Sequence, residues 1–275
     1  MPGNLYIVST PIGNLDDLTV RAVRVLGDVG VIFAESVERT QKLLSHYDIK
    51  KKIYSFNKDN EKRKVKNVVD YLNKSCDVAL VTDAGTPSIS DPGFLLLTKI
   101  PNTIKVIPIP GASSLSCALS VSRIPMNSFI FLGFLSKNDS DRKKKLLEVS
   151  ESKLPVCLFE SKHRLVELFK DISEIFGADT KIGLFREMTK IYETVVHKKV
   201  SELLLEFTSS KPKGEFVIII EPKQYILIEK SYTTAIKDLI LKKYSNKDIV
   251  DIIKLFSQDT KKEIYKNVLT IRQNV

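Results

Sequence analysis

Three groups of ionisable side chains each follow a predicted strand, and together they could transfer protons or bind a charged ligand. Each group places a carboxylate near cations: Glu35 near Arg39, Glu160 near His163 and Arg164, and Glu187 near Arg186 and Lys190. A carboxylate can accept a proton, while guanidinium and ammonium groups bind phosphates. If the strands are parallel, their carboxyl ends open into one crevice. We therefore expect a functional site, with an ordinary ion-pair network between two domains as the alternative.

The stretch 78–93, VALVTDAGTPSISDPG, is the clearest element that could position such a site. Its apolar start shows no alternation, which is typical of a strand buried on both faces of a parallel sheet. Gly85 can adopt a positive φ and Pro87 fixes its own φ, so the chain leaves the strand in a tight loop. Loops of this kind bind ligands in open α/β sheets, although a plain connecting turn has the same composition. Ser90-Asp91-Pro92 predicts the cap and the first turn of the next helix.

Strand, loop and helix patterns repeat through the first half of the chain. Further strands are predicted at 5–9, 31–34, 53–56 and 104–108. Their alternation with amphipathic helices predicts a doubly wound, mostly parallel sheet. No G-x-G-x-x-G or G-x-x-x-x-G-K-[ST] pattern is present, which argues against dinucleotide and NTPase sites of those types.

The pattern changes twice along the chain, which predicts three parts. They are an N-terminal α/β domain at 1-122, a C-terminal α/β domain with a mixed sheet at 123-226, and a basic helical module at 227-275. The first change falls at Arg123–Asn127, where the strand and helix pattern is interrupted. In the last part, helices are predicted to start at Thr233, Asn246 and Asp259.

Composition limits the class of protein. The 275 residues carry a formal net charge of +10, which favours a polyanionic partner such as RNA, although abundant Lys, Ile and Asn also suit a compositional bias. Cys76, Cys117 and Cys157 are scattered in or beside apolar segments, which predicts free thiols and no metal site. No stretch approaches the roughly 18 apolar residues of a membrane span, and the start lacks a signal-peptide pattern. We expect a cytoplasmic protein that does not bind membranes.

Six motifs, taken in order, resemble those of one enzyme family. They are Ser9–Leu15, Asp83–Pro87 with Ser90–Gly93, Pro110–Ser114, Glu160-Ser161 with His163-Arg164, Arg186-Glu187 with Thr189-Lys190, and Lys213–Phe216. The chain resembles the small-subunit ribosomal RNA cytidine 2'-O-methyltransferases of the tetrapyrrole methylase superfamily. The resemblance runs from Leu5 to about Glu221 and continues more weakly through the basic tail.

The resemblance implies two α/β domains with S-adenosylmethionine bound in the cleft between them, and usually a homodimer. The substrate would be a cytidine of 16S rRNA in the small ribosomal subunit, and no metal is expected. The implied cofactor-binding residues are Pro11, Asp83, Ala84, Gly85, Thr86, Ile89, Ser113, Ser114, Phe159 and Gly214.

Catalysis and RNA binding are assigned to the charged groups. Methyl transfer to a ribose hydroxyl needs an aligned donor and a proton acceptor. We predict Glu187 or Glu35 as that acceptor, with Arg186 and Lys190 as the other catalytic residues. The predicted RNA-binding residues are Arg39, Lys42, Arg142, Lys143, His163 and Arg164.

The chain departs from the family pattern after the second predicted strand, and two alternative functions stay open. The family generally has Glu-Asp-Thr-Arg where this chain has Glu35-Ser36-Val37-Glu38, so an arginine is replaced by Glu38, and Arg39 is the candidate to take its place. One alternative is a catalytically weakened, RNA-binding relative. The other is a precorrin-type tetrapyrrole methyltransferase, whose polycarboxylate substrate would also suit a basic cleft.

Overall fold

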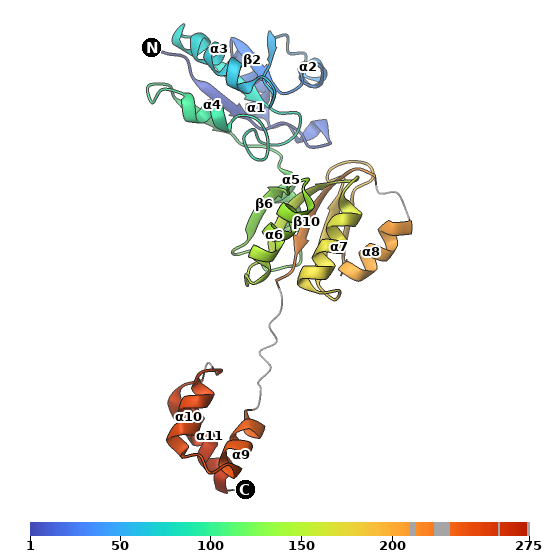
Figure 1. Ribbon diagram of the computed structural model, residues 1–275. Coiled ribbons are helices and arrows are strands. Elements are labelled where there is room, and N and C mark those ends of the chain that lie inside the picture. The colour runs from blue at the N-terminus through green and yellow to red at the C-terminus, as the bar shows by residue number, and fades with distance from the viewer. Residues whose placement is uncertain (210–212, 223–231, 258, 274–275) are drawn as a thin grey trace. The chain divides into compact units, whose positions relative to one another are not determined.

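The computed structural model describes residues 1–209, 213–222, 232–257 and 259–273 (Figure 1). The chain divides into two compact units, Met1–Lys223 and Gln224–Val275. Among the described residues of the first unit, the strands form two five-stranded sheets. The second unit is helical.

The first sheet has the strand order β3-β2-β4-β1-β5, and every neighbouring pair in it is parallel. Its strands are β1 (Leu5–Val8), β2 (Val31–Ala34), β3 (Ile53–Ser55), β4 (Val78–Val81) and β5 (Val106–Ile109). Because parallel strands end at the same edge, the loops that follow β2, β4, β1 and β5 are neighbours there.

Helices cover both faces of this sheet (Figure 1). They are α1 (Val20–Asp28), α2 (Val37–His46), α3 (Glu61–Asn73) and α4 (Phe94–Lys99), and a short 3₁₀ helix, η1 (Leu15–Asp17), precedes α1. Successive strand residues face opposite sides, so Ala79 and Val81 pack with α1 and α2, whereas Val78 and Leu80 pack with α3 and α4. The predicted doubly wound fold is confirmed.

The second sheet has the order β6-β7-β10-β8-β9. Its strands are β6 (Ile130–Phe134), β7 (Val156–Ser161), β8 (Lys181–Arg186), β9 (Thr194–Lys199) and β10 (Glu215–Ile220). Only β6 and β7 pair in parallel, and the other pairs are antiparallel. Because β10 runs antiparallel between β7 and β8, the carboxyl ends of those two strands flank its amino end. The sequence predicts that these ends meet if the strands are parallel. In this mixed sheet the ends of β7 and β8 meet although their shared neighbour β10 is antiparallel to both.

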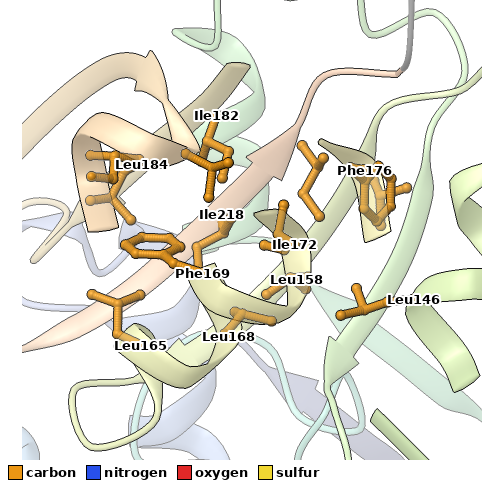
Figure 2. Close-up of a cluster of buried hydrophobic side chains, with 14 of the residues drawn as sticks. Leu146, Leu158, Leu165, Leu168, Phe169, Ile172, Phe176, Ile182, Leu184 and Ile218 are labelled. Carbon is orange, nitrogen blue, oxygen red and sulfur yellow. The ribbon is translucent and has the colours of Figure 1, made fainter. Parts of the chain in front are cut away.

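One face of the second sheet carries α6 (Asp139–Ser150), α7 (Leu165–Phe176) and α8 (Val200–Ser209). The apolar side chains of α7 recur every three to four residues, and Figure 2 shows them packed among strand residues such as Leu158 and Ile218. Each fully buried side chain of this size contributes about 1.5–3 kcal/mol. The opposite face packs against α5 (Ser114–Ser120), which directly follows β5 of the first sheet.

The helical unit contains α9 (Thr233–Leu241), α10 (Asn246–Lys254) and α11 (Lys261–Gln273) around buried Ile236, Ile249 and Ile264. The first two helices begin where the sequence predicts. The third begins at Lys261 instead of Asp259, because Thr260 and Glu263 form a reciprocal capping box. In this box, Thr260 N donates to Glu263 Oε2 at 2.7 Å, and Glu263 N donates to Thr260 Oγ1 at 3.3 Å.

The prediction that Ser90-Asp91-Pro92 forms the cap and first turn of the following helix is wrong. Helix α4 begins at Phe94, and Gly93 occupies the capping position with φ 132°, a value that favours glycine. The Gly93 N–H is satisfied by Glu61 Oε1 at 3.0 Å, so the helix start needs no serine side chain. Ser90 and Asp91 are thereby left in a separate loop.

In the described part of the chain, no helix is both long and apolar enough to cross a membrane. The same residues contain no group of three or more His, Cys, Asp or Glu side chains arranged to hold a metal ion.

Candidate active site

The loops that follow β1, β4 and β5 are tied together at the edge of the first sheet. Thr10 and Gly85 form an isolated antiparallel bridge, with their N–H groups donating at 2.9 and 3.0 Å to each other's carbonyl oxygens. The hydroxyls of Ser9 and Thr86 lie 2.8 Å apart. A Cβ on Gly111 would lie 2.9 Å from Ser9 Cβ, so the third loop also approaches closely. These contacts fix the floor of the site before any ligand binds.

The ends of β2 and β4 are joined by charged groups. The Asp83 N–H donates to Glu35 Oε2 at 3.2 Å, and Arg39 Nη1 lies 3.3 Å from Asp83 Oδ2. Asp83 Oδ1 is buried and has no hydrogen-bond partner. Ser36 caps α2 by accepting from Arg39 N at 3.3 Å, while Glu38 pairs with Lys42 in solvent. The replacement Glu38 therefore points away, and Arg39 reaches the loop at the end of β4.

A second charged group lies where β8 ends and β10 begins. Lys190 Nζ donates to Glu187 Oε1 at 3.0 Å and to Glu215 Oε2 at 3.2 Å, and the Glu215 N–H also donates to Glu187 Oε1 at 3.0 Å. Burial alone would raise the pKa of Glu187, but the Lys190 ammonium and the Glu215 amide outweigh it and hold this pKa below its ordinary value. Burial opposes the charge on Lys190, yet these carboxylates raise its pKa. Glu187 is therefore a neutralised and weakly basic carboxylate.

Glu160 lies at the end of β7 and is only 1% exposed. Its Oε1 accepts from Ser161 N at 2.6 Å and from Arg164 Nε at 2.9 Å, while Arg164 Nη1 donates to the Leu135 carbonyl at 3.1 Å. Its Oε2 is buried without a partner. The Glu160–Arg164 pair thus holds the β7 end rigidly and leaves one acceptor free.

These loops and strand ends enclose a cleft of about 360 Å³ within the first unit. One wall comes from the first sheet and the start of α5, and the other comes from the second sheet. The aromatic rings of Phe134, Phe159, Phe185 and Phe216 line the second wall, and the rings of Phe134 and Phe159 lie 5.5 Å apart. The cleft therefore combines an apolar wall with polar loops, as ligand sites commonly do.

The lining of the cleft is acidic although the chain as a whole is basic. Six carboxylates line it, against two cations: Glu35, Asp83, Asp91, Glu160, Glu187 and Glu215, against Arg39 and Lys190. In a partly desolvated cleft, such a lining attracts a cation and repels an anion.

Asp91 is the carboxylate that this environment perturbs most visibly. Burial, followed by the charges of Glu35, Asp83 and Glu215, raises its pKa to about 6, and Lys58 opposes the shift. Its carboxylate makes no hydrogen bond or ion pair with any residue that the structure describes.

The predicted cofactor residues fall into two groups. Asp83, Ala84, Ile89, Ser114 and Phe159 line the cleft. The others are not part of the lining: Pro11, Gly85 and Thr86 belong to the tied loops, Ser113 is at the start of α5, and Gly214 lies against the Glu187 side chain. Of the predicted catalytic residues, Glu35, Glu187 and Lys190 line the cleft. Arg186 is not part of the lining, and its Nε donates to the Lys213 carbonyl at 2.7 Å.

The predicted RNA-binding residues are not brought together. Arg39 lines the cleft, while Lys42 and His163 are exposed. Arg142 is 3% exposed, and its Nε lies 2.6 Å from Asp171 Oδ2 in the interface between α6 and α7. Arg142 is thus not presented for RNA contact, because its guanidinium is used inside the fold. Its neighbour Lys143 pairs with Glu174 at 2.8 Å.

Several lining residues were not among the predicted sites. They include Ile12, Ser90, Asp91, Phe134, Met188 and Glu215. Asp91 gave no signal of its own, because Asp before Pro is common in turns and at helix starts. The aromatic wall gave no signal either, since phenylalanine in a strand is expected in any core.

Comparisons with known proteins agree with this arrangement. Residues 4–204 match the family described as Tetrapyrrole (Corrin/Porphyrin) Methylases. A cobalt precorrin-4 methyltransferase of known structure superposes with a TM-score of 0.58 over 78% of this chain and 94% of that chain. At 18% identity this likeness shows the fold alone.

Two relatives are much more similar in sequence. Ribosomal RNA small subunit methyltransferase I of Buchnera aphidicola subsp. Acyrthosiphon pisum is 40% identical over 274 residues, which cover 97% of this chain and 96% of that protein. The protein of the same name from Borrelia garinii subsp. bavariensis is 48% identical over 219 residues, which cover 78% of this chain and 97% of that protein. The chain therefore belongs to the tetrapyrrole methylase family and, within it, to the ribosomal RNA small subunit methyltransferase I group.

Proposed function

We propose that this protein transfers a methyl group from S-adenosylmethionine to the ribose 2'-hydroxyl of a cytidine in 16S rRNA, within the small ribosomal subunit. The observation that carries the proposal is the cleft itself, which lies between the matched motifs of the two sheets and has an acidic, partly unsatisfied lining. The names of the relatives at 40–48% identity support the choice of RNA as substrate.

The cleft residues fit a sulfonium donor. Bound there, S-adenosylmethionine would supply an activated methyl group on a positively charged sulfur. Two buried carboxylate oxygens in the lining, Asp83 Oδ1 and Glu160 Oε2, lack hydrogen-bond partners. A buried acceptor without a donor is costly, so both oxygens would be stabilised by a cationic ligand that carries N–H groups. Ala84, Ile89, Ser114 and Phe159 would complete the binding surface.

The same charge pattern limits how RNA can enter. Six carboxylates would repel phosphates, so we propose that only the ribose and base of the target nucleotide reach into the cleft while the phosphates stay at its rim. Arg39 lines the cleft with a side chain that is 69% exposed, which suits such a rim contact. Lys42 and the helical unit with α9, α10 and α11 are further candidates for the RNA-binding surface.

The acidic lining disfavours the rival substrate class. A precorrin-type tetrapyrrole is a polycarboxylate, and the cleft would repel it for the same reason that it would repel phosphates. A catalytically inert RNA-binding relative is also disfavoured, because the cleft retains unpartnered acceptors that a bound ligand would satisfy. We further propose that the active form is a homodimer in the cytoplasm, where assembling ribosomal subunits are found. Light scattering of the purified chain tests the dimer.

Mapping ribose methylation in 16S rRNA from cells with and without this gene tests the function. One cytidine should lose its 2'-O-methyl group in the deletion strain, and purified protein with the methyl donor should restore it on isolated small subunits. Protein-free 16S rRNA and a precorrin are the comparison substrates. Unchanged methylation in the deletion strain, or methyl transfer to the precorrin alone, would contradict the proposal.

A further inference from the structure

The loop Ser88–Gly93, between β4 and α4, is built from strained backbone at the mouth of the cleft. Ser88 and Ser90 adopt left-handed conformations with φ of 69° and 65°, and Gly93 has φ 132°. A non-glycine residue in this region costs roughly 1–3 kcal/mol, so it persists only where surrounding contacts impose it. Two such serines within three residues indicate that the position of this loop matters.

Contacts within the loop, from the segment that follows β3 and from β6 hold the loop in place. Ser88 N donates to the Pro92 carbonyl at 3.1 Å, and Gly93 N donates to Glu61 Oε1 at 3.0 Å. Lys58 Nζ donates to the Ser90 carbonyl at 3.4 Å. On the side of the second sheet, a Cβ on Gly133 would lie 2.7 Å from Ser90 Oγ, so β6 abuts the loop closely. This packing holds Asp91 in a fixed position.

Asp91 differs from the other carboxylates of the cleft in having no partner. Glu35 accepts from the Asp83 amide, and Glu187 is neutralised by Lys190. The Asp91 carboxylate, in contrast, has no hydrogen bond or ion pair among the described residues. An unpaired carboxylate in a partly desolvated cleft binds a proton more readily than a paired one, so it is the better base.

We propose that Asp91 is the catalytic residue that accepts the proton of the substrate hydroxyl, in place of Glu187 or Glu35. This assignment rests on the proposed methyltransferase function. In the step, the hydroxyl oxygen forms a bond to the methyl carbon while the carbon–sulfur bond breaks and its electron pair stays on sulfur. The hydroxyl proton passes to the Asp91 carboxylate. Charge balances, because the sulfonium becomes a neutral thioether as Asp91 becomes neutral.

The charges around Asp91 suit this role. The groups that face it are Glu35, Lys58, Asp83 and Glu215, and Arg39 and Lys190 lie in the same lining. Burial and the three carboxylates raise its pKa to about 6, so it is ionised at neutral pH and still a stronger base than an ordinary aspartate. Bases tuned close to the working pH are the more effective general-base catalysts.

The test uses the full-length protein and small subunits that lack the methyl group. Single-turnover methyl transfer is measured from pH 5 to 9 for the parent, Asp91→Asn and Glu187→Gln, and affinity for S-adenosylmethionine is measured by calorimetry. We expect the parent rate to fall below an apparent pKa near 6. Asp91→Asn should lose about 10²- to 10⁴-fold in rate together with this acid limb, while its donor affinity should fall only about fivefold, the effect of one lost negative charge in the lining. Glu187→Gln should keep the acid limb.

Retention of both rate and acid limb by Asp91→Asn would overturn the assignment and leave the methyltransferase function intact. Failure of the parent to methylate 16S rRNA would overturn both. A variant that unfolds would lose donor binding as well as rate, and in that case Asp91→Glu decides the matter, because it should restore a measurable rate with a shifted acid limb. An Asp91→Glu variant that binds the donor but has no rate or acid limb would count against the assignment.

Discussion

A Cβ atom on Gly214 would lie 2.6 Å from Oε1 of Glu187, so the carboxylate occupies its position only because residue 214 has no side chain. Gly214 also has φ 100°, which favours glycine for a second reason. Glu187 itself has φ 51°, and its N–H donates to the Glu215 carbonyl at 3.1 Å. The start of β10 and the end of β8 thus fit each other at atomic contact beside the cleft.

Gly214→Ala should therefore displace Glu187 and slow methyl transfer by about 10²-fold, because a misplacement near 1 Å can cost that much. Single-turnover rates and thermal unfolding measure the effect. Gly177→Ala is the matched control, since Gly177 has φ 105° but nothing within 4 Å of an added Cβ. Equal losses of stability with an unchanged rate in both variants would show that only backbone strain matters at position 214.

Lys190→Met should destabilise the protein at neutral pH by about 1 kcal/mol, because it leaves the half-buried Glu187 carboxylate without its cation. The lowered pKa of Glu187 fixes the sign of the pH dependence: its ionised form stabilises the fold above the ordinary value of 4.5, and that stabilisation is lost as the pH falls below it. Urea unfolding of the parent and Lys190→Met should therefore differ at pH 7 and converge toward pH 3. A gap that is constant across this range would contradict the pairing.

Asp91→Asn should stabilise the protein at alkaline pH while it abolishes the proposed proton transfer. The pKa of Asp91 is raised from 3.8 to about 6, so ionisation costs folding energy that is absent below pH 4 and fully present above pH 6. After allowance for solvent screening, we expect about 1 kcal/mol, or a rise of about 2–4 °C in Tm, at pH 8. Calorimetric scans at pH 8 and pH 4 measure it, and a Tm gain of equal size at both values would contradict the shifted pKa.

Arg142→Met should destabilise the fold by about 3–5 kcal/mol, because Asp171 would keep a buried charge without its closest cation. The salt dependence of rRNA affinity should not change, whereas loss of a phosphate contact would lower its slope by about one. Lys144→Met, at the exposed neighbouring position, should stay within about 0.5 kcal/mol of the parent. A changed slope with unchanged stability would restore Arg142 to the RNA-binding surface.

The acidic lining should favour the charged donor over the neutral thioether product. Glu35→Gln keeps an oxygen that can accept from Asp83 N but removes one negative charge. A charge at a few ångströms contributes about 1 kcal/mol even in a high dielectric, so the ratio of donor to product affinity should fall by about fivefold. Calorimetric titrations of S-adenosylmethionine and S-adenosylhomocysteine give this ratio, and the effect should shrink at 1 M salt. Equal weakening of both ligands would point to a role in loop structure.

Local sequence determined the first sheet and its loops. Buried parallel strands appear as unbroken apolar runs, and glycine, proline and hydroxyl residues mark the turns that follow them, so β1, β2 and β4 with their loops could be located without coordinates. The loop at Asp83–Pro87, which was predicted to bind the ligand, is one such loop. These signals lie within a few residues of one another, which is why the sequence alone expresses them.

Only the tertiary structure decided which charged side chains meet. Arg142 and Arg164 look alike in a basic sequence, yet one is buried against Asp171 and the other holds Glu160 at the cleft. The antiparallel insertion of β10 between β7 and β8 brought Glu215 to Lys190, and the packing of Ser90 against Gly133 helped to place Asp91. Each of these depends on strand order and on contacts between distant segments. Charge and burial at a site are sums over such neighbours, and residue types and spacing do not specify them.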